Sequence, residues 1–435
     1  MTEQTPQLRR VVSRWQIVGL AMNDVIGSGV YLLPAAAALL LGPVSLAAVF
    51  LAGLAVLLVV LCFAEASSHF DQPGSAYIYA RTAFGELVGF GVGWMTWLAR
   101  VASVAALSAG FAQALSYLWP ATEAGWARGL AIALPVLVLT ALNVVGIRSG
   151  VRTAVLLVVC KLVPLVVFVF GGLFAISWER IVEQPAGEGR LGEAALLLLF
   201  AYAGFENTPA SAGEYRNPQR DVPFALLTNI TVVTLLYAAV QAVALGTLSN
   251  LGQSATPLAD AARVFLGSWA GWLLTFGAAL SILGTNSNTV LAGPRYLFAM
   301  ARDGFGPRFL ARVHPRFRTP AAAVILQTAI ALPLASSGSF VTLAALSVVA
   351  RLATYLGTAA AVPVLRRKIP ARPATIRLPG GALIPVAAGL LTVGLAASAT
   401  AKNLLAGAGA LAVGFVLYLL RDRGVRRAPA APGDS

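Results

Sequence analysis

The chain has 435 residues, of which 58% are hydrophobic and only 11% are charged. Long apolar runs with this composition are typical of an integral membrane protein and exclude a soluble globular or a disordered chain. The formal net charge of +14 is spread over the short segments between the apolar runs, which argues against a nucleic-acid partner.

The apolar runs predict an all-α integral membrane protein with about twelve transmembrane helices, since a span needs about 20 residues. Turn residues and charges mark where each span ends. In chain order, the expected spans cover residues 15–36, 42–64, 84–117, 128–147, 152–176, 192–213, 223–247, 263–299, 320–336, 340–364, 381–400 and 403–420.

Positive charge predicts how the chain is oriented. With the N-terminus inside, 22 of the 31 lysines and arginines fall in cytoplasmic segments. The five that fall outside are Arg128, Arg180, Arg190, Arg263 and Lys402. Because lysine and arginine accumulate on the cytoplasmic side of membrane proteins, we expect both tails, 1–14 and 421–435, in the cytoplasm and the chain in the cytoplasmic membrane.

Neither a cleaved leader nor a metal or disulfide site is expected. The run Ala35-Ala36-Ala37 superficially resembles a signal-peptidase site, but Asn23 and Asp24 interrupt the preceding apolar run, so we expect the first span to be retained. Cys62 and Cys160 both lie within spans, which argues against a disulfide framework. We expect no cofactor and no bound metal.

Two spans carry glycine and polar residues near the middle of the membrane. Gly27-Ser28-Gly29 interrupts the first span, and Ala203-Gly204-Phe205-Glu206 interrupts the sixth. A helix broken at this depth is tolerated only where it is buried in protein or lines a cavity. A matched pair of breaks in the two halves of a chain is typical of a transporter's substrate site.

Four motifs occur in order along almost the whole chain. They are Ile26-Gly27-Ser28-Gly29-Val30-Tyr31, the stretches 64–70 and 73–77, the stretches 204–206 and 214–220, and the stretches 300–304 and 313–315. In these motifs the chain resembles the amino acid, polyamine and organocation (APC) transporter superfamily, specifically its bacterial amino acid permeases.

The resemblance implies a leucine-transporter-like fold, in which two inverted repeats of five helices surround a central site. It places the first repeat in residues 15–176, the second repeat in residues 192–364, and two further helices in residues 381–420. The breaks in the first and sixth spans stand where this symmetry requires them.

The resemblance also implies an amino acid substrate held between the two breaks. Free N–H groups at the start of a half-helix suit its carboxylate, and carbonyl groups freed by the second break suit its ammonium. Close helix packing through small residues is the alternative explanation of the glycines. The substrate-binding residues implied are Ile26, Gly27, Ser28, Gly29, Phe200, Tyr202, Ala203, Gly204 and Phe205.

Phe200 and Tyr202 stand where the family often has an aromatic gate above the second break. Lipid contact or core packing is the alternative for each residue. The sequence leaves open which of the two, if either, gates the site.

Lys161 matches a lysine of several sodium-independent permeases of this family, where it occupies the space of the sodium ion of sodium symporters. Removal from water favours the neutral form of a lysine, which suits it to binding and releasing a proton. Asp24, where the family usually has a small or neutral residue, lies at a similar depth. We expect the two to form a buried pair, either a proton-coupling element or a permanent structural ion pair. Asp24 facing a cationic substrate group is a further alternative.

Glu206 follows the second break, at an acidic position that relatives use in protonation or gating. Capping of the free N–H groups of the next half-helix is the alternative role. Arg100 and Arg351 also lie within spans, and we expect each to pair with a carboxylate or with backbone carbonyls.

The sequence therefore predicts a secondary active amino acid transporter, with protons as the coupling ion, working by alternating access in the lipid bilayer. Exchange of amino acids or polyamines remains an alternative, as does sodium symport, which the polar run Thr285-Asn286-Ser287-Asn288 favours. A channel or sensor on the same scaffold lacks the expected filter motif or signalling domain. An enzyme is not expected, because His69 and His314 fall in predicted loops without a nucleophile or metal cluster. The oligomeric state is left open.

Overall fold

A computed structural model describes residues 10–71, 74–146, 151–371 and 373–420, and the side chains of 151–157 are not described. The predicted tail 421–435 and most of the tail 1–14 lie outside these residues. The regular secondary structure of the described residues is all helical, with no β-strand and one isolated bridge between Val12 and Tyr215.

Every predicted span folds as a helix or a pair of helices. The helices are α1 (Arg14–Val25), α2 (Gly29–Leu41), α3 (Ser45–Ser68), α5 (Glu86–Leu115), α6 (Gly125–Val145), α7 (Val151–Leu173), α9 (Leu191–Tyr202), α10 (Pro218–Thr247), α12 (Ser268–Arg302), α13 (Ala321–Ser337), α14 (Phe340–Lys368), α15 (Leu383–Ala397) and α16 (Ala401–Leu419). Within the described ranges, seven helical segments are long and apolar enough to cross a membrane. The protein is therefore an all-α membrane protein.

Both predicted breaks are present. The first span divides into α1 and α2, with residues 26–28 between them. The sixth divides after α9 at Ala203 and Gly204, but it does not resume as an α-helix. The next ten residues form the 3₁₀ segment η3 (Phe205–Glu214) instead. Pro209 and the non-helical backbone of Ser211 account for this, because neither sustains regular i→i−4 hydrogen bonding.

Three short helices connect the long ones and were not predicted. They are α4 (Ser75–Phe84), α8 (Trp178–Val182) and α11 (Pro257–Leu266). Each contains charged side chains and is shorter than a span, so a search for apolar runs passes over it.

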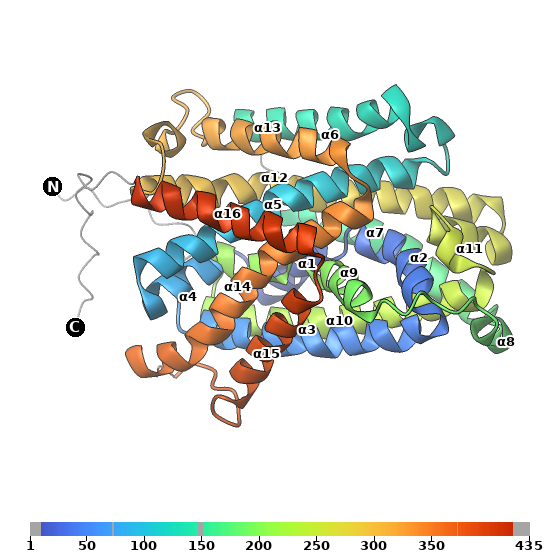
Figure 1. Ribbon diagram of the computed structural model, residues 1–435, viewed down its shortest axis with the longest axis horizontal. Helices are drawn as coiled ribbons and strands as arrows, with labels where there is room; N and C mark the ends of the chain where they lie inside the picture. Colours follow the sequence, from blue (N-terminus) through green and yellow to red (C-terminus); the bar gives the residue numbers. More distant parts are fainter. Residues whose placement is uncertain (1–9, 72–73, 147–150, 372, 421–435) are drawn as a thin grey trace.

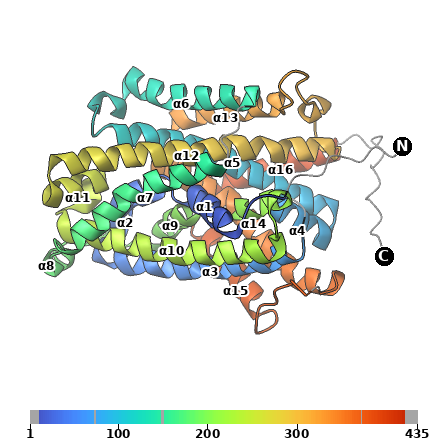
Figure 2. The same ribbon diagram turned by 180° about the vertical axis from the view of Figure 1, so that it is seen from behind.

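The broken helices lie at the centre of the molecule. In Figure 1, α3 and α10 run along one side, and α5, α12, α6 and α13 run along the other. Figure 2 shows α1 between α7, α10 and α12, all of which it contacts. The long helices therefore enclose both breaks and shield their unpaired backbone groups from lipid.

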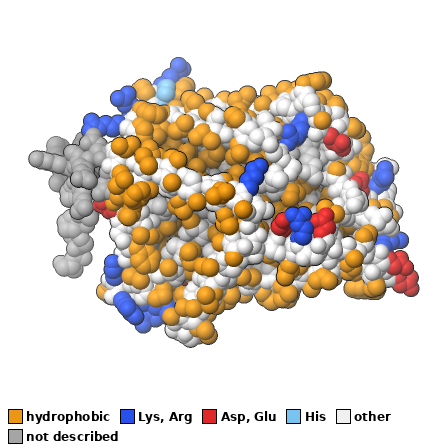
Figure 3. Space-filling view, in the orientation of Figure 1, with side chains coloured by type: hydrophobic (Ala, Val, Ile, Leu, Met, Phe, Trp, Pro, Cys, Tyr) orange, Lys and Arg blue, Asp and Glu red, His pale blue; other side chains and the backbone are white. Residues whose placement is uncertain are grey.

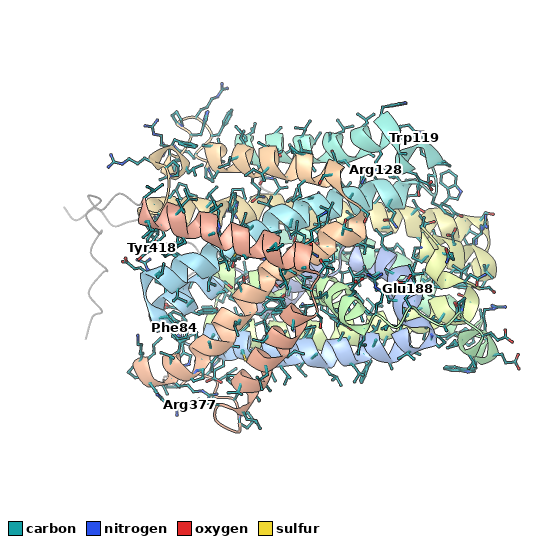
Figure 4. The ribbon with its side chains drawn as sticks, in the orientation of Figure 1. Phe84, Trp119, Arg128, Glu188, Arg377 and Tyr418 are labelled. Atoms are coloured by element: carbon teal, nitrogen blue, oxygen red, sulfur yellow. The ribbon has the colours of Figure 1, made fainter. Side chains whose placement is uncertain are left out.

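The surface matches a molecule surrounded by a bilayer. Figure 3 shows a broad hydrophobic belt, with lysine and arginine gathered mainly towards the ends of the long axis. Phe84, Arg377 and Tyr418 lie towards one end, and Trp119, Arg128 and Glu188 towards the other (Figure 4). Arg377 and Arg128, which the sequence assigns to opposite sides of the membrane, thus lie in opposite halves of the long axis.

Candidate functional site

The two helix breaks touch backbone to backbone. A Cβ atom built on Gly204 would stand 2.5 Å from the carbonyl oxygen of Asp24, and one on Gly29 would stand 2.7 Å from the Cα of Ala201. Gly204 also has φ +125°, a conformation that residues with a side chain rarely adopt. Only glycine fits at these crossings, so the sequence sets how closely the broken helices approach.

The N-terminus of α2 faces the gap between the breaks. The first N–H groups of a helix have no intrahelical partner and carry the positive end of its dipole. Ser28 precedes them, is fully buried, and its hydroxyl has no hydrogen-bond partner among the described residues. Buried hydroxyls normally have partners, so Ser28 and the start of α2 leave donors available to a bound anion.

A cavity of about 30 Å³ lies at this place. It is wide enough for about two water molecules, so an amino acid enters only when the surrounding side chains or helices move apart. The residues that line it are Asp24, Val25, Gly27, Ser28, Gly29, Arg100, Ser103, Leu107, Phe200, Ala203, Gly204, Asn207, Thr285, Thr289 and Arg351.

Seven of the predicted site residues line this cavity, and five do not. Phe200 lines it and makes an edge contact with Phe340, whereas the Tyr202 hydroxyl donates to the Val49 carbonyl at 2.9 Å. Phe205 packs between Phe63 and Tyr355. Tyr202 and Phe205 are therefore core residues here. The other predicted residues outside the lining are Ile26, Lys161 and Glu206.

Lys161 binds the end of α1. Its Nζ donates to the carbonyl oxygens of Asn23 at 3.0 Å and Ile26 at 2.7 Å, and it lies 3.3 Å from Thr285 Oγ1. Three donors thus meet three acceptors, which matches a charged ammonium. The C-terminus of a helix is the negative end of its dipole, so a cation is favoured there.

The expected ion pair between Asp24 and Lys161 is wrong for this structure. Among the described residues, the Lys161 ammonium and the Asp24 carboxylate do not come within 4.0 Å of each other as an ion pair. The Asp24 carboxylate instead accepts from the Asn288 side chain at 2.6 Å. The reason is helix geometry: Lys161 reaches the free carbonyls at the end of α1, while the Asp24 side chain points to the cavity and to α12.

Glu206 is the carboxylate that pairs with both buried arginines; the sequence predicted a carboxylate as one possible partner for each arginine, but not that they share this one. Its Oε1 lies 3.1 Å from Arg100 Nη2 and 3.0 Å from Arg351 Nε. Its Oε2 accepts from Gly204 N–H at 2.9 Å, which caps the second break, and lies 3.4 Å from the Tyr355 hydroxyl. The sequence signal for this contact was the presence of Arg100 and Arg351 within apolar spans. Their spacing along the chain does not reveal that both pair with one carboxylate.

The polar residues of α12 make hydrogen bonds to the end of α1 and to α5. Thr285 Oγ1 lies within 3.2 Å of the Asn23 and Ile26 carbonyls, Asn286 donates to Ser108 Oγ at 3.1 Å, and Asn288 bonds Asp24. In the described part of the chain, no group of three histidine, cysteine, aspartate or glutamate side chains has a metal-binding arrangement.

A protein-family model described as "Amino acid permease" matches residues 12–419. The chain belongs to the amino acid permease family. Permeases are transporters and not enzymes, and the helical segments described above make this permease a multi-pass membrane protein.

Curated relatives of this permease are transporters with differing substrates. A methylthioribose transporter of Bacillus subtilis (strain 168) is 28% identical over 97% of this chain and 95% of its own length. The branched-chain amino acid permease BcaP of the same organism is 27% identical over the same shares. The serine/threonine exchanger SteT, also from that organism, is 32% identical over 72% of this chain and 73% of its own. The names of these relatives therefore do not identify the substrate of this permease.

Proposed function

We propose that this permease is a secondary active transporter that takes up an amino acid by alternating access, coupled to protons through Lys161. The observation that carries the proposal is the bonding of the Lys161 ammonium to the end of α1 and to α12. Relatives named as an amino acid permease and an amino acid exchanger support the substrate class.

The substrate site lies between the two breaks. The free N–H groups at the start of α2, together with the unpartnered Ser28 hydroxyl, bind the α-carboxylate. The carbonyl oxygens of Ala203 and neighbouring residues at the end of α9 accept from the ammonium, and Asp24 supplies a negative charge in the same cavity. Phe200 closes the site against Phe340.

Lys161 couples protons to the movement of α1. In the closed structure, its charged form is satisfied by the Asn23 and Ile26 carbonyls and by Thr285. When α1 moves away from α7 and α12, these acceptors leave, and an unpaired ammonium in the membrane interior is unstable. The proton is then released. Lys161 occupies the acceptors that a sodium ion would need, which favours protons over sodium.

Glu206 has a structural role in this proposal. Its carboxylate accepts from Gly204 N–H, Arg100 and Tyr355 and forms an ion pair with Arg351, so it stabilises the second break and positions both arginines without carrying a proton. This replaces the proton-carrying role considered from the sequence with the capping role.

The fold proposed is twelve membrane spans in a leucine-transporter-like arrangement. Residues 15–176 and 192–364 form inverted repeats of five spans each, and residues 381–420 form the last two spans. Both tails are assigned to the cytoplasm, the side to which the sequence also assigns Arg377. The positions of Arg377 and Arg128 in opposite halves of the long axis support this orientation.

Uptake by the purified protein in sodium-free proteoliposomes tests the proposal. A pool of labelled amino acids is offered with an inward proton gradient either imposed or collapsed by a protonophore. Accumulation that depends on the gradient is the expected result. Accumulation that requires sodium, or that appears only with amino acid inside the vesicles, would replace proton symport with sodium symport or exchange.

A further inference from the structure

Two arginines reach the substrate cavity from two helices that pack against each other. Arg100 comes from α5 and Arg351 from α14, and both line the cavity together with Ser103 of α5. They are 2% and 3% exposed. Arginine is rare and costly within a span, so a pair at a cavity needs an explanation beyond packing.

The described residues satisfy only part of these guanidinium groups. Arg100 Nη2 donates to Glu206 and to the Asn207 side chain, and Arg351 Nη2 donates to Ser103 Oγ at 2.9 Å. Arg100 Nε, Arg351 Nη1 and Arg351 Nε are buried and have no hydrogen-bond partner within the described chain, although Arg351 Nε lies 3.0 Å from Glu206 Oε1 as an ion pair. Unpartnered buried donors cost free energy, and these belong to side chains that line a cavity.

Glu206 is the acidic partner of both arginines, and both of its oxygens are already in contact with donor groups. Its two oxygens already lie against Arg100, Arg351, Gly204 N–H and the Tyr355 hydroxyl. The three side chains Arg100, Arg351 and Glu206 together carry one net positive charge. In a medium of low dielectric constant, such a charge favours an anionic ligand.

We propose that Arg351 and Arg100 form a second anion subsite that selects amino acids with a carboxylate side chain. This inference rests on the proposed function, because it takes the α-carboxylate to be bound at the start of α2. The side-chain carboxylate then accepts from Arg351 Nη1 and Arg100 Nε, and the ammonium lies near Asp24. Aspartate and glutamate are the substrate class.

The charges of the whole site agree with a substrate of net charge −1. Lys161 and the two arginines are positive and Asp24 and Glu206 are negative, which leaves one positive charge when Lys161 is protonated. An acidic amino acid neutralises it. A protonated Lys161 therefore strengthens binding of this substrate class, which ties proton binding to substrate binding.

Competition among isosteric amino acids tests the subsite. Uptake of the pool of labelled amino acids into proteoliposomes is measured in the presence of unlabelled competitors, which are L-glutamate, L-aspartate, L-glutamine, L-asparagine and L-leucine. The proteins compared are wild type, Arg351→Gln, Arg351→Lys and Arg128→Gln. Arg128 donates to the Gly338 carbonyl away from the cavity, so its variant controls for loss of an arginine. We expect glutamate or aspartate to compete at least about tenfold better than its amide in wild type, the effect of one charge-assisted hydrogen bond.

The variants distinguish the anion subsite from a packing role of the arginines. Arg351→Gln should lose the tenfold preference while still transporting the amide, Arg351→Lys should retain part of it, and Arg128→Gln should match wild type. Equal competition by acids and amides in wild type would overturn the subsite and leave the proposed function standing. Absence of transport and of competition by every amino acid in wild type would overturn both.

Discussion

The carbonyl oxygen of Asp24 lies against the α-carbon of Gly204, so the two broken helices meet through backbone alone. This contact joins the end of α1, where Lys161 binds, to the second break, which Glu206 caps. Movement of either half-helix therefore changes the surroundings of the substrate cavity and of the coupling lysine together.

Replacement of Gly204 by alanine should destabilise the protein by about 2 kcal/mol or more, because the new Cβ meets the Asp24 carbonyl and φ is positive. The measurement is the midpoint of thermal unfolding in detergent. Gly394→Ala is the matched control, since no other atom lies within 4 Å of the Cβ that alanine would add at position 394. Equal midpoints for the two variants would show that the backbones do not touch as described.

Glu206→Gln should lower the free energy of unfolding by about 3–5 kcal/mol, the usual effect of leaving a buried charge without its partner. Here two arginines lose their carboxylate. Glu188→Gln provides the comparison, because its partner Arg190 is half exposed and a surface ion pair in contact with water contributes little to stability. A Glu206→Gln protein as stable as Glu188→Gln would contradict the structural role of Glu206.

Phe200 and Tyr202 should behave differently, although they are two residues apart. Phe200→Ala removes a side chain of the cavity and should raise the KM for transport roughly tenfold or more, since an aromatic contact contributes about 1–3 kcal/mol. Tyr202→Phe removes only a hydrogen bond to Val49, so it should cost about 1 kcal/mol of stability with KM unchanged. A changed KM in Tyr202→Phe would show instead that Tyr202 takes part in gating the substrate site.

The sequence predicted the spans and both breaks because hydrophobic length and misplaced glycines are local signals. Which side chains face the cavity depends on how helices rotate about their axes, and local signals do not carry that information. Of the residues proposed from the sequence, Gly27, Ser28 and Phe200 line the cavity, whereas Tyr202 and Phe205 pack in the core. The partners of Lys161 and Glu206 come from helices far along the chain, beyond the reach of spacing arguments.

Gradient-driven uptake by Lys161→Ala tests the central claim most directly. Wild-type and variant proteoliposomes, free of sodium, are compared for accumulation under an inward proton gradient and for exchange of internal against external amino acid. Lys161→Ala should retain exchange, which shows that it is folded and binds substrate, and should lose the accumulation driven by protons. Accumulation in Lys161→Ala that still collapses with a protonophore would show that the coupling proton binds elsewhere.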